Sequence, residues 1–283
     1  VYAFSDRCSR NKREGQFKQE FKSGDLSIED LKLFNFLSSS MKKKEQFEMM
    51  HYMFMMAEAW KGYRNWSQEG YPISPPYKFQ LGGTPLNHAI VAAMKIVPDF
   101  QKKHGVEKIH TVFLTDGYSH RMDDAFTVIT RDGNDIETTR PVQGWSRSTT
   151  HITDPVTNAK IVIGKSNGYR NEQTVAMFKL LKKRVSNMNI VGFFIAGSGK
   201  RGMVHKNIIS DKFDLHSYTD YNAIKDIYRK LKKENVVVCK EEGYDEFYIL
   251  PGAGAMKESE EFEVSPNAKV GELKKAFMKS ANN

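Results

Sequence analysis

The stretch FQLGGTPLNHAIVAAMKI, residues 79–96, decides the fold when it is taken together with HTVFLTDGYSH, residues 110–120. In the first, a Gly-Gly-Thr-Pro turn leads into apolar residues at helical spacing, and proline is tolerated in the first turn of a helix. In the second, a nearly continuous apolar run stops at Thr-Asp-Gly, which is typical of a strand that is covered on both faces. We therefore predict a helix over 85–104 and a strand over 109–115, with Asp116 at the strand's tip.

Buried strands and amphipathic helices alternate along much of the rest of the chain. Further strands are predicted at 1–6 and 189–196, and a further helix at 171–186. This alternation predicts an α/β fold with a doubly wound, mostly parallel sheet, in which these two strands and 109–115 run parallel. Ligands of such sheets bind beyond the carboxyl ends of the strands, which is where Asp116 falls.

Two segments depart from this alternation. Residues 123–167 are rich in threonine and contain Asp-Gly-Asn and Asp-Pro turn signals, which predicts an inserted set of β-hairpins. The insertion begins just beyond the predicted strand tip, so we expect the hairpins to project from that edge of the sheet and to contact a partner. Residues 236–283 are predicted to be a small β/α appendage to a domain that covers 1–235.

Residues 27–60 have a helical pattern and are rich in methionine and aromatic residues. Methionine is flexible enough to fill irregular gaps in a protein interior. We therefore predict that these side chains pack in the core and do not form a ligand surface.

The composition is that of a globular protein. The chain has 283 residues, of which 40% are hydrophobic and 27% charged, and no apolar run approaches the roughly 20 residues of a membrane helix. Cys8 and Cys239 have no CxxC spacing, which argues against a zinc ribbon and favours a reducing, cytoplasmic setting. The net charge of +9 comes largely from lysines in short runs on predicted helix faces, so neither nucleic acid nor a membrane is the expected partner.

Thr84 and Asp116 are the candidate site residues. A carboxylate at a strand tip and a hydroxyl in the turn before a helix would meet at one edge of a parallel sheet, and oxygen ligands suit a hard cation such as Mg²⁺. The alternative is that Thr84 only caps the helix that Pro85 begins.

The motifs LGGTPLNHAI and TVFLTDG closely resemble the second and third motifs of the von Willebrand factor A fold. The metal-ion-dependent adhesion site of that family combines an Asp-x-Ser-x-Ser loop, a threonine and an aspartate. Thr84 matches the threonine and Asp116 the aspartate, so the resemblance implies Mg²⁺ as the cofactor. It covers roughly 1–121 and 168–235.

One motif of that family is missing from this sequence. No Asp-x-Ser-x-Ser precedes Thr84, and Ser-Asp-Arg-Cys-Ser-Arg over residues 5–10 has its serine one place too late. Because the family's second strand often reads like VYAFSD, we expect the chain to begin at strand two, with strand one absent. Weak Mg²⁺ binding is then expected.

The residues of the two motifs and the hairpin insertion that follows them resemble those of the cobaltochelatase-subunit-like proteins of large tailed phages and bacteria. That resemblance implies a non-enzymatic, metal-dependent binding module in the cytoplasm, or in the host cytoplasm if a phage encodes it. It also implies a protein partner, a MoxR-type AAA+ ATPase, in a chelatase-like or remodelling complex.

Two alternatives of other classes stay open. A hydrolase or nucleotide-binding enzyme could use the same crevice, but AGSGKRG over 196–202 lacks the spacing of a phosphate-binding loop, and neither HExxH nor GxSxG occurs. A basic nucleic-acid-binding protein is supported by net charge alone, and its binding would show a steep salt dependence.

Overall fold

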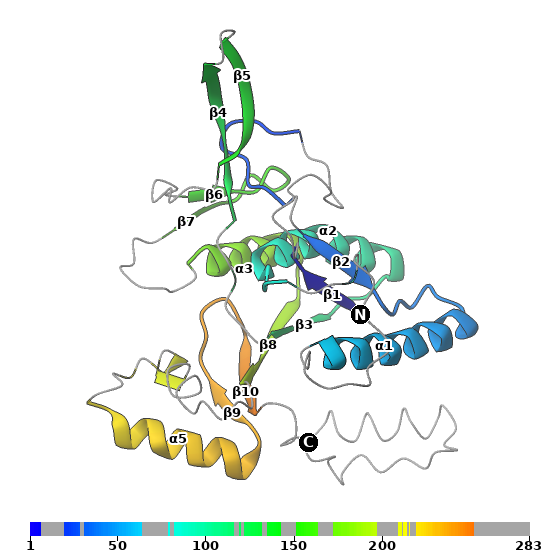
Figure 1. Cartoon of the computed structure of the whole chain (residues 1–283), viewed down its shortest axis with the longest axis vertical. Helices are drawn as coiled ribbons and strands as arrows, with labels where there is room; N and C mark the ends of the chain where they lie inside the picture. The colour runs from blue at the N-terminus through cyan, green and yellow to red at the C-terminus, as the bar shows by residue number, and fades with distance from the viewer. Residues whose placement is uncertain are drawn as a thin grey trace. The chain divides into compact units, whose positions relative to one another are not determined.

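The computed structural model describes residues 1–6, 20–28, 31–63, 79, 82–115, 119, 122–131, 135–142, 151–163, 172–196, 209–210, 212–213, 215 and 219–251 (Figure 1). They form a mixed α/β structure with a mostly parallel four-stranded sheet, helices packed on it, and small hairpins. The helices are α1 (Lys43–Tyr63), α2 (Leu86–His104), α3 (Glu172–Arg184) and α5 (Tyr221–Glu234). The strands are β1 (Tyr2–Ser5), β2 (Lys32–Asn35), β3 (Ile109–Thr115), β4 (Asp124–Arg131), β5 (Asp135–Val142), β6 (His151–Thr153), β7 (Lys160–Val162), β8 (Met188–Ala196), β9 (Val237–Cys239) and β10 (Glu246–Pro251).

The chain divides into two compact units. The first contains Val1–Phe193 and Lys240–Phe247, and the second contains Phe194–Cys239 and Tyr248–Asn283. In the second unit, α5 contacts β9. The predicted boundary at residue 236 stays a prediction, because most of the segment that follows it lies outside the described residues.

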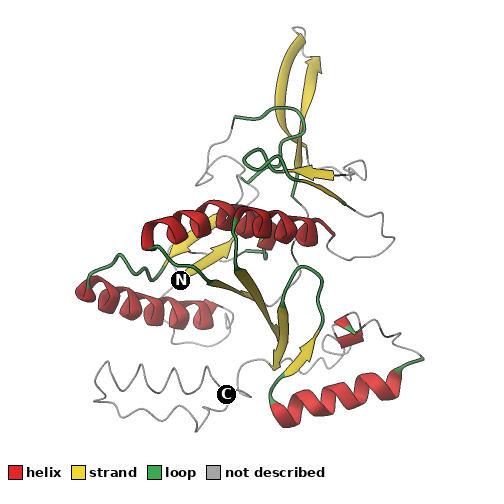
Figure 2. Ribbon diagram, turned by 180° about the vertical axis from the view of Figure 1, so that it is seen from behind, coloured by secondary structure: helices red, strands yellow, loops and turns green. Residues whose placement is uncertain are grey.

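The four-stranded sheet has the order β3-β8-β10-β9. The predicted strands at 109–115 and 189–196 are therefore confirmed as members of one sheet, β3 and β8, in which they are neighbours. The helices predicted at 85–104 and 171–186 are confirmed as α2 and α3, which lie side by side (Figure 2). The N-terminal strand differs from the prediction. β1 pairs along its length with β2 in a separate antiparallel sheet, and no described strand joins it to β3. The prediction that residues 1–6 share the main sheet is wrong.

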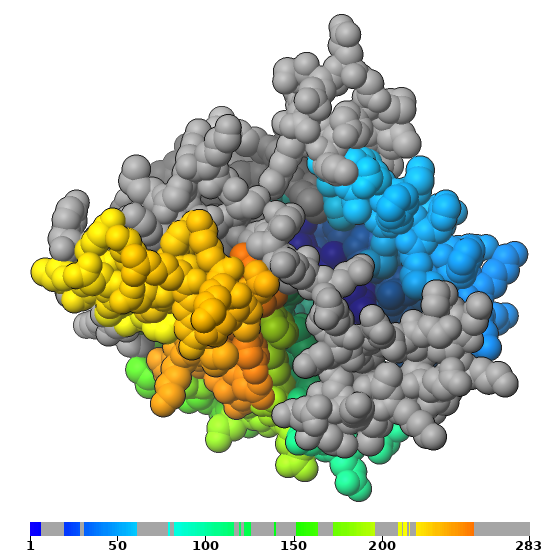
Figure 3. Space-filling model, turned by 90° about the horizontal axis from the view of Figure 1, so that it is seen from below, coloured from blue at the N-terminus to red at the C-terminus, as the bar shows by residue number. Residues whose placement is uncertain are grey.

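A second correction concerns residues 27–60, which were predicted to be helical throughout. Residues 32–35 are instead strand β2, because the backbone there hydrogen-bonds to β1. The methionine-rich part is a helix, α1, but several of its large apolar side chains lie on the surface (Figure 3). The prediction that they pack in the core is therefore wrong for these side chains. None of the described helices is both long and apolar enough to cross a membrane.

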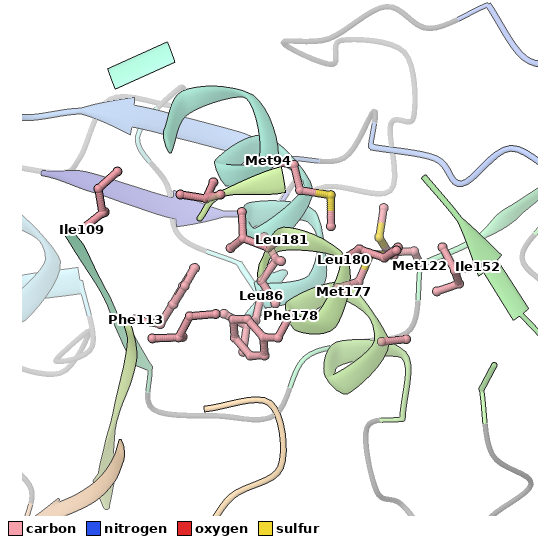
Figure 4. Packing of buried hydrophobic residues seen from close by; sticks show 14 residues of the cluster. Leu86, Met94, Ile109, Phe113, Met122, Ile152, Met177, Phe178, Leu180 and Leu181 are labelled. Atoms are coloured by element: carbon pink, nitrogen blue, oxygen red, sulfur yellow. The ribbon is translucent and has the colours of Figure 1, made fainter. Parts of the chain in front are cut away.

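The core of the first unit lies between the sheet and helices α2 and α3 (Figure 4). The rings of Phe113 on β3 and Phe178 on α3 meet edge to face, with centroids 5.2 Å apart. The other face of β3 is open, since the side chains of Val112 and Leu114 are exposed. Burial of both faces of this strand, as its apolar sequence predicted, is not found.

The insertion forms hairpins, as predicted. β4 pairs with β5 in antiparallel register, and β6 pairs with β7. The base of the first hairpin is joined to the segment before β2, because the amide of Ala125 donates to the carbonyl of Asp25 and its carbonyl accepts from Gly24. The first hairpin is thus anchored to this segment, and both hairpins separate β3 from α3 in the sequence.

Candidate functional site

The turn before α2 is held by the carboxyl end of β1. The amide of Gly82 donates to Ser5 Oγ over 2.8 Å, and the amide of Gly83 donates to Asp6 Oδ1 over 2.5 Å. Ser5 is buried and Asp6 is half-buried. A carboxylate that directly follows β1 therefore lies against the turn that carries Thr84.

The close approach of Asp6 explains a glycine in this turn. A Cβ atom on Gly82 would lie 1.8 Å from Asp6 Oδ1 and 3.2 Å from the carbonyl oxygen of Asp6. Any side chain at position 82 would therefore displace the carboxylate. Glycine at position 82 lets the backbone of the turn lie directly on the end of β1.

The amino end of α2 is capped from another segment of the chain. Pro85 occupies the N-cap position and forms no side-chain cap hydrogen bond, while the amide of Asn87 donates to Ser119 Oγ over 2.8 Å. Ser119 belongs to the segment that follows β3. Thr84 takes part through its backbone, since its carbonyl accepts the amide of Leu86, the first residue of α2, over 2.9 Å.

A network of buried polar side chains holds the amino end of α2 in place. Asn87 Nδ2 donates to Gln173 Oε1 over 2.8 Å, Thr174 Oγ1 donates to Asn87 Oδ1, and the amide of Met122 also donates to Gln173 Oε1. These groups are buried, so each hydrogen bond replaces one that water would otherwise make. The network joins the amino ends of α2 and α3 to the segment after β3.

Removing Asn87 should destabilise the protein through this network. We expect Asn87→Ala to lower the free energy of unfolding by about 2 kcal/mol, because the buried Gln173 and Thr174 side chains lose a partner. Urea denaturation measures the change. Asn189→Ala, which removes a surface hydrogen bond to Glu246, is the matched control and should change it by less than about 0.5 kcal/mol. Equal effects of the two variants would contradict a structural role for the network.

Thr84 lies half-buried in the turn, and Asp116 lies outside the described residues. Asp116 is bracketed in the sequence by Thr115, the buried last residue of β3, and by Ser119, which contacts the start of α2. The structure thus brings the two neighbourhoods together. Whether Thr84 and Asp116 contact one ion stays a prediction.

The oxygen groups around the turn before α2 are of the type that a hard cation binds. They are the Asp6 carboxylate and the hydroxyls of Thr84 and Ser119, and Mg²⁺ takes oxygen ligands. One carboxylate oxygen of Asp6 already accepts the Gly83 amide. Within the described ranges, no group of three or more His, Cys, Asp and Glu side chains is placed to hold a metal. A cation here would therefore keep several of its waters.

Sequence analysis did not assign Asp6 or Ser119 to the site. A signal for Asp6 was present, because it follows a strand directly, as Asp116 does. Ser119 carried no such signal, since its role depends on a contact with α2.

Comparison with known proteins adds no relative: the chain matches no protein-family model, no curated protein and no solved structure.

Proposed function

We propose that this chain is a non-enzymatic, metal-dependent protein-binding module of the von Willebrand factor A type, built on a doubly wound α/β sheet. One observation carries the proposal. The carboxyl end of β1 and the segment after β3 both contact the short stretch Gly82–Asn87, through Ser5 and Asp6 on one side and Ser119 on the other. Side-chain oxygens that follow two different strands, β1 and β3, thus both contact the turn that carries Thr84 or the start of α2, and α/β sheets bind ligands beyond the carboxyl ends of their strands.

In this proposal Thr84 and Asp116 hold Mg²⁺, and the Asp6 carboxylate lies close enough to the turn to support it. The ion supplies a positive charge, and an acidic side chain of the partner binds to it and completes its coordination. The protein's own part is to hold the oxygen donors in place. The hydrogen bonds from Gly82 and Gly83 to β1, and from Asn87 to Ser119, fix the backbone of the turn for this purpose.

The proposed partner is a MoxR-type AAA+ ATPase in a cytoplasmic chelatase-like or remodelling complex. Two observations support this choice. The GGTP and TDG motifs resemble those of the cobaltochelatase-subunit-like proteins, and an insertion of hairpins directly follows the second motif. Loops and hairpins that extend from a rigid scaffold are where binding specificity resides.

Metal binding is the first test. We expect Mg²⁺ to bind with a dissociation constant of about 1 mM or weaker, since few protein oxygens replace its waters. Asp116→Ala should abolish binding, Thr84→Val should weaken it, and Thr84→Ser should preserve it, because serine retains the hydroxyl. Calorimetry measures binding directly. At 20 mM Mg²⁺, thermal unfolding should show stabilisation of up to about 2 kcal/mol in the wild type and in Thr84→Ser, but none in Asp116→Ala. Binding that ignores Asp116→Ala would refute the proposed site.

Partner binding is the second test. Thr127 and Thr139 face each other in the β4–β5 register, so residues 128–138 can be replaced by a two-residue Asn-Gly turn that keeps the base of the hairpin. We expect this variant to unfold at the wild-type temperature but to lose binding to the ATPase. Interferometry with Mg²⁺ and with EDTA measures the interaction. Binding that survives both the shortened hairpin and EDTA would count against this partner mode.

A further inference from the structure

Helix α5 carries a line of basic side chains on its exposed surface. Lys225, Arg229 and Lys232 follow one another at spacings of four and three residues, and Tyr221 lies one turn before them, so the four side chains share one face of the helix. All four are exposed, and we call them the basic row. Lys233 is exposed beside it. Atoms of α5, in yellow, form part of the surface in Figure 3.

The positive charge of the basic row is not neutralised by neighbouring carboxylates. Within the part of the chain that the structure describes, neither Lys225 nor Lys232 forms an ion pair. Lys232 Nζ lies 4.8 Å from the centroid of the Tyr228 ring, a contact that leaves its charge in place. Arg229 pairs with Asp226 over 2.9 Å, but both side chains are largely exposed, so an anion can compete for the guanidinium.

The lysines of α3 have the opposite arrangement. Lys179 contacts Glu242 and Lys182 contacts Asp245, each over 2.7 Å. Pairs of this kind cancel charge locally, which is why the net charge of +9 does not by itself indicate an anionic partner. The two lysines of the basic row keep their charge, so α5 is a better place for such a partner than α3.

The apolar face of α5 is already used within the second unit. Ile224 and Leu231 are buried, and α5 contacts β9. Amphipathic helices bind membranes by burying their apolar face among the lipids, and here that face is not available. The exposed face of α5 therefore fits a partner that is bound through charge.

The features of the basic row match a single strand of nucleic acid. From Tyr221 to Lys232 the helix rises by about 17 Å, which is the length of about five phosphates at the spacing within one strand. The Tyr221 side chain is 49% exposed in line with the cations, where a base can stack on its ring. A nucleic acid strand supplies both the line of negative charges and the aromatic bases.

We propose that the exposed face of α5 binds single-stranded nucleic acid, with Lys225, Arg229, Lys232 and Lys233 contacting phosphates and Tyr221 stacking on a base. The interaction does not depend on base sequence, because phosphates and base faces are common to all nucleotides. A dissociation constant on the order of 10 μM at about 50 mM salt is expected, and four phosphate contacts give a slope of about −3 for log K against log salt concentration.

Fluorescence anisotropy of a labelled 15-nucleotide oligothymidylate, titrated with the full chain in EDTA, tests the proposal. Lys225→Gln combined with Lys232→Gln should weaken binding at least tenfold at about 50 mM salt and halve the salt slope, since two of four phosphate contacts are lost. Tyr221→Ala should weaken binding at least about fivefold without changing the salt slope, and Tyr221→Phe should preserve binding because it keeps the ring. An oligouridylate of the same length, measured in parallel, distinguishes DNA from RNA as the preferred strand.

Lys43→Gln combined with Lys44→Gln is the matched control. It removes the same charge from exposed positions on α1, and binding should stay within about twofold of the wild type, because salt screens charges that do not contact the strand. Circular dichroism checks that each variant is folded. Equal losses in the two double variants would mean that net charge alone attracts the strand, and would overturn the proposal. So would binding to vesicles of anionic phosphatidylserine in the absence of oligonucleotide binding. Because EDTA is present throughout, the outcome does not depend on the proposed metal site.

Discussion

Replacing Arg184 by alanine is expected to lower the free energy of unfolding by about 3–5 kcal/mol, because it leaves the Asp154 carboxylate buried without a counter-ion. Arg184 Nε donates to Asp154 Oδ2 over 2.8 Å, Nη2 contacts the second carboxylate oxygen, and Nη1 donates to the carbonyl of Met94 over 3.1 Å. The Asp154 side chain is 1% exposed. The guanidinium thus joins the β6–β7 turn to α2 and α3 in one contact.

The same pair determines how stability depends on acid. The hydrogen bonds from Arg184 hold the pKa of Asp154 well below its usual range, with help from Thr157 Oγ1 and the amide of Val156. A carboxyl whose pKa is depressed by folding stabilises the protein above its unfolded pKa of about 4, and this contribution is lost as the pH falls toward the folded pKa. The difference between wild type and Arg184→Ala should therefore be full at pH 7 and shrink in strong acid.

Urea denaturation at pH 7 and pH 3 measures both effects. Lys179→Ala, which removes an exposed ion pair with Glu242, is the control and should cost less than about 1 kcal/mol. Adding Asp154→Asn to Arg184→Ala should recover part of the loss, because an amide is cheaper to bury than an unpaired charge. A loss below about 1 kcal/mol for Arg184→Ala would show that the pair is not coupled to folding.

The elements that could be predicted from the sequence are those with local signals at both ends. Pro85 and Gly105 bound the helix α2, and Gly105 has φ of +60° at the C-cap, where glycine is favoured. The strand β3 follows at the predicted residues, because its apolar run is bounded by a charged turn and by Thr-Asp-Gly. The apolar periodicity and the residues that begin and end each element were sufficient to predict α2 and β3.

The mistaken predictions concern partners that are distant in the sequence. The residues around β2 alternate in a way that suits a strand or a helix, and pairing with β1 decides between them. The helical period of α1 was read correctly from the sequence, but periodicity does not say which face is covered. The exposed Phe47 and Phe54 differ from the prediction for that reason.

In the candidate site, too, local features could be predicted from the sequence and contacts between distant residues could not. The turn at Thr84 and the strand end before Asp116 were predicted from local motifs. The contacts that bring Ser5 to Gly82 and Asn87 to Ser119 connect residues 77 and 32 positions apart, and no local pattern encodes them. The shared metal ion stays a prediction, because Asp116 lies outside the described residues.

Gly192→Val is expected to lower the free energy of unfolding by at least about 3 kcal/mol, since valine must displace two aromatic rings. A Cβ atom on Gly192 would lie 2.5 Å from Phe247 Cδ2 and 2.6 Å from Tyr244 Cε1. Those rings meet edge to face with centroids 4.9 Å apart, and the Phe178 ring lies 4.5 Å from that of Tyr244. Glycine on β8 therefore creates the space that this aromatic group fills.

Backbone strain does not explain the expected loss, because valine is favoured in strands and the φ angle of Gly192 is not in the left-handed region. Gly105→Ala is the matched control with the opposite cause: its φ is positive and the space around it is empty, so it should cost only about 1 kcal/mol. Thermal and urea unfolding measure both variants. Phe247→Ala combined with Gly192→Val should cost less than the sum of the two single changes, because the smaller side chain leaves room for valine. Strict additivity would mean that the rings and Gly192 do not share this space.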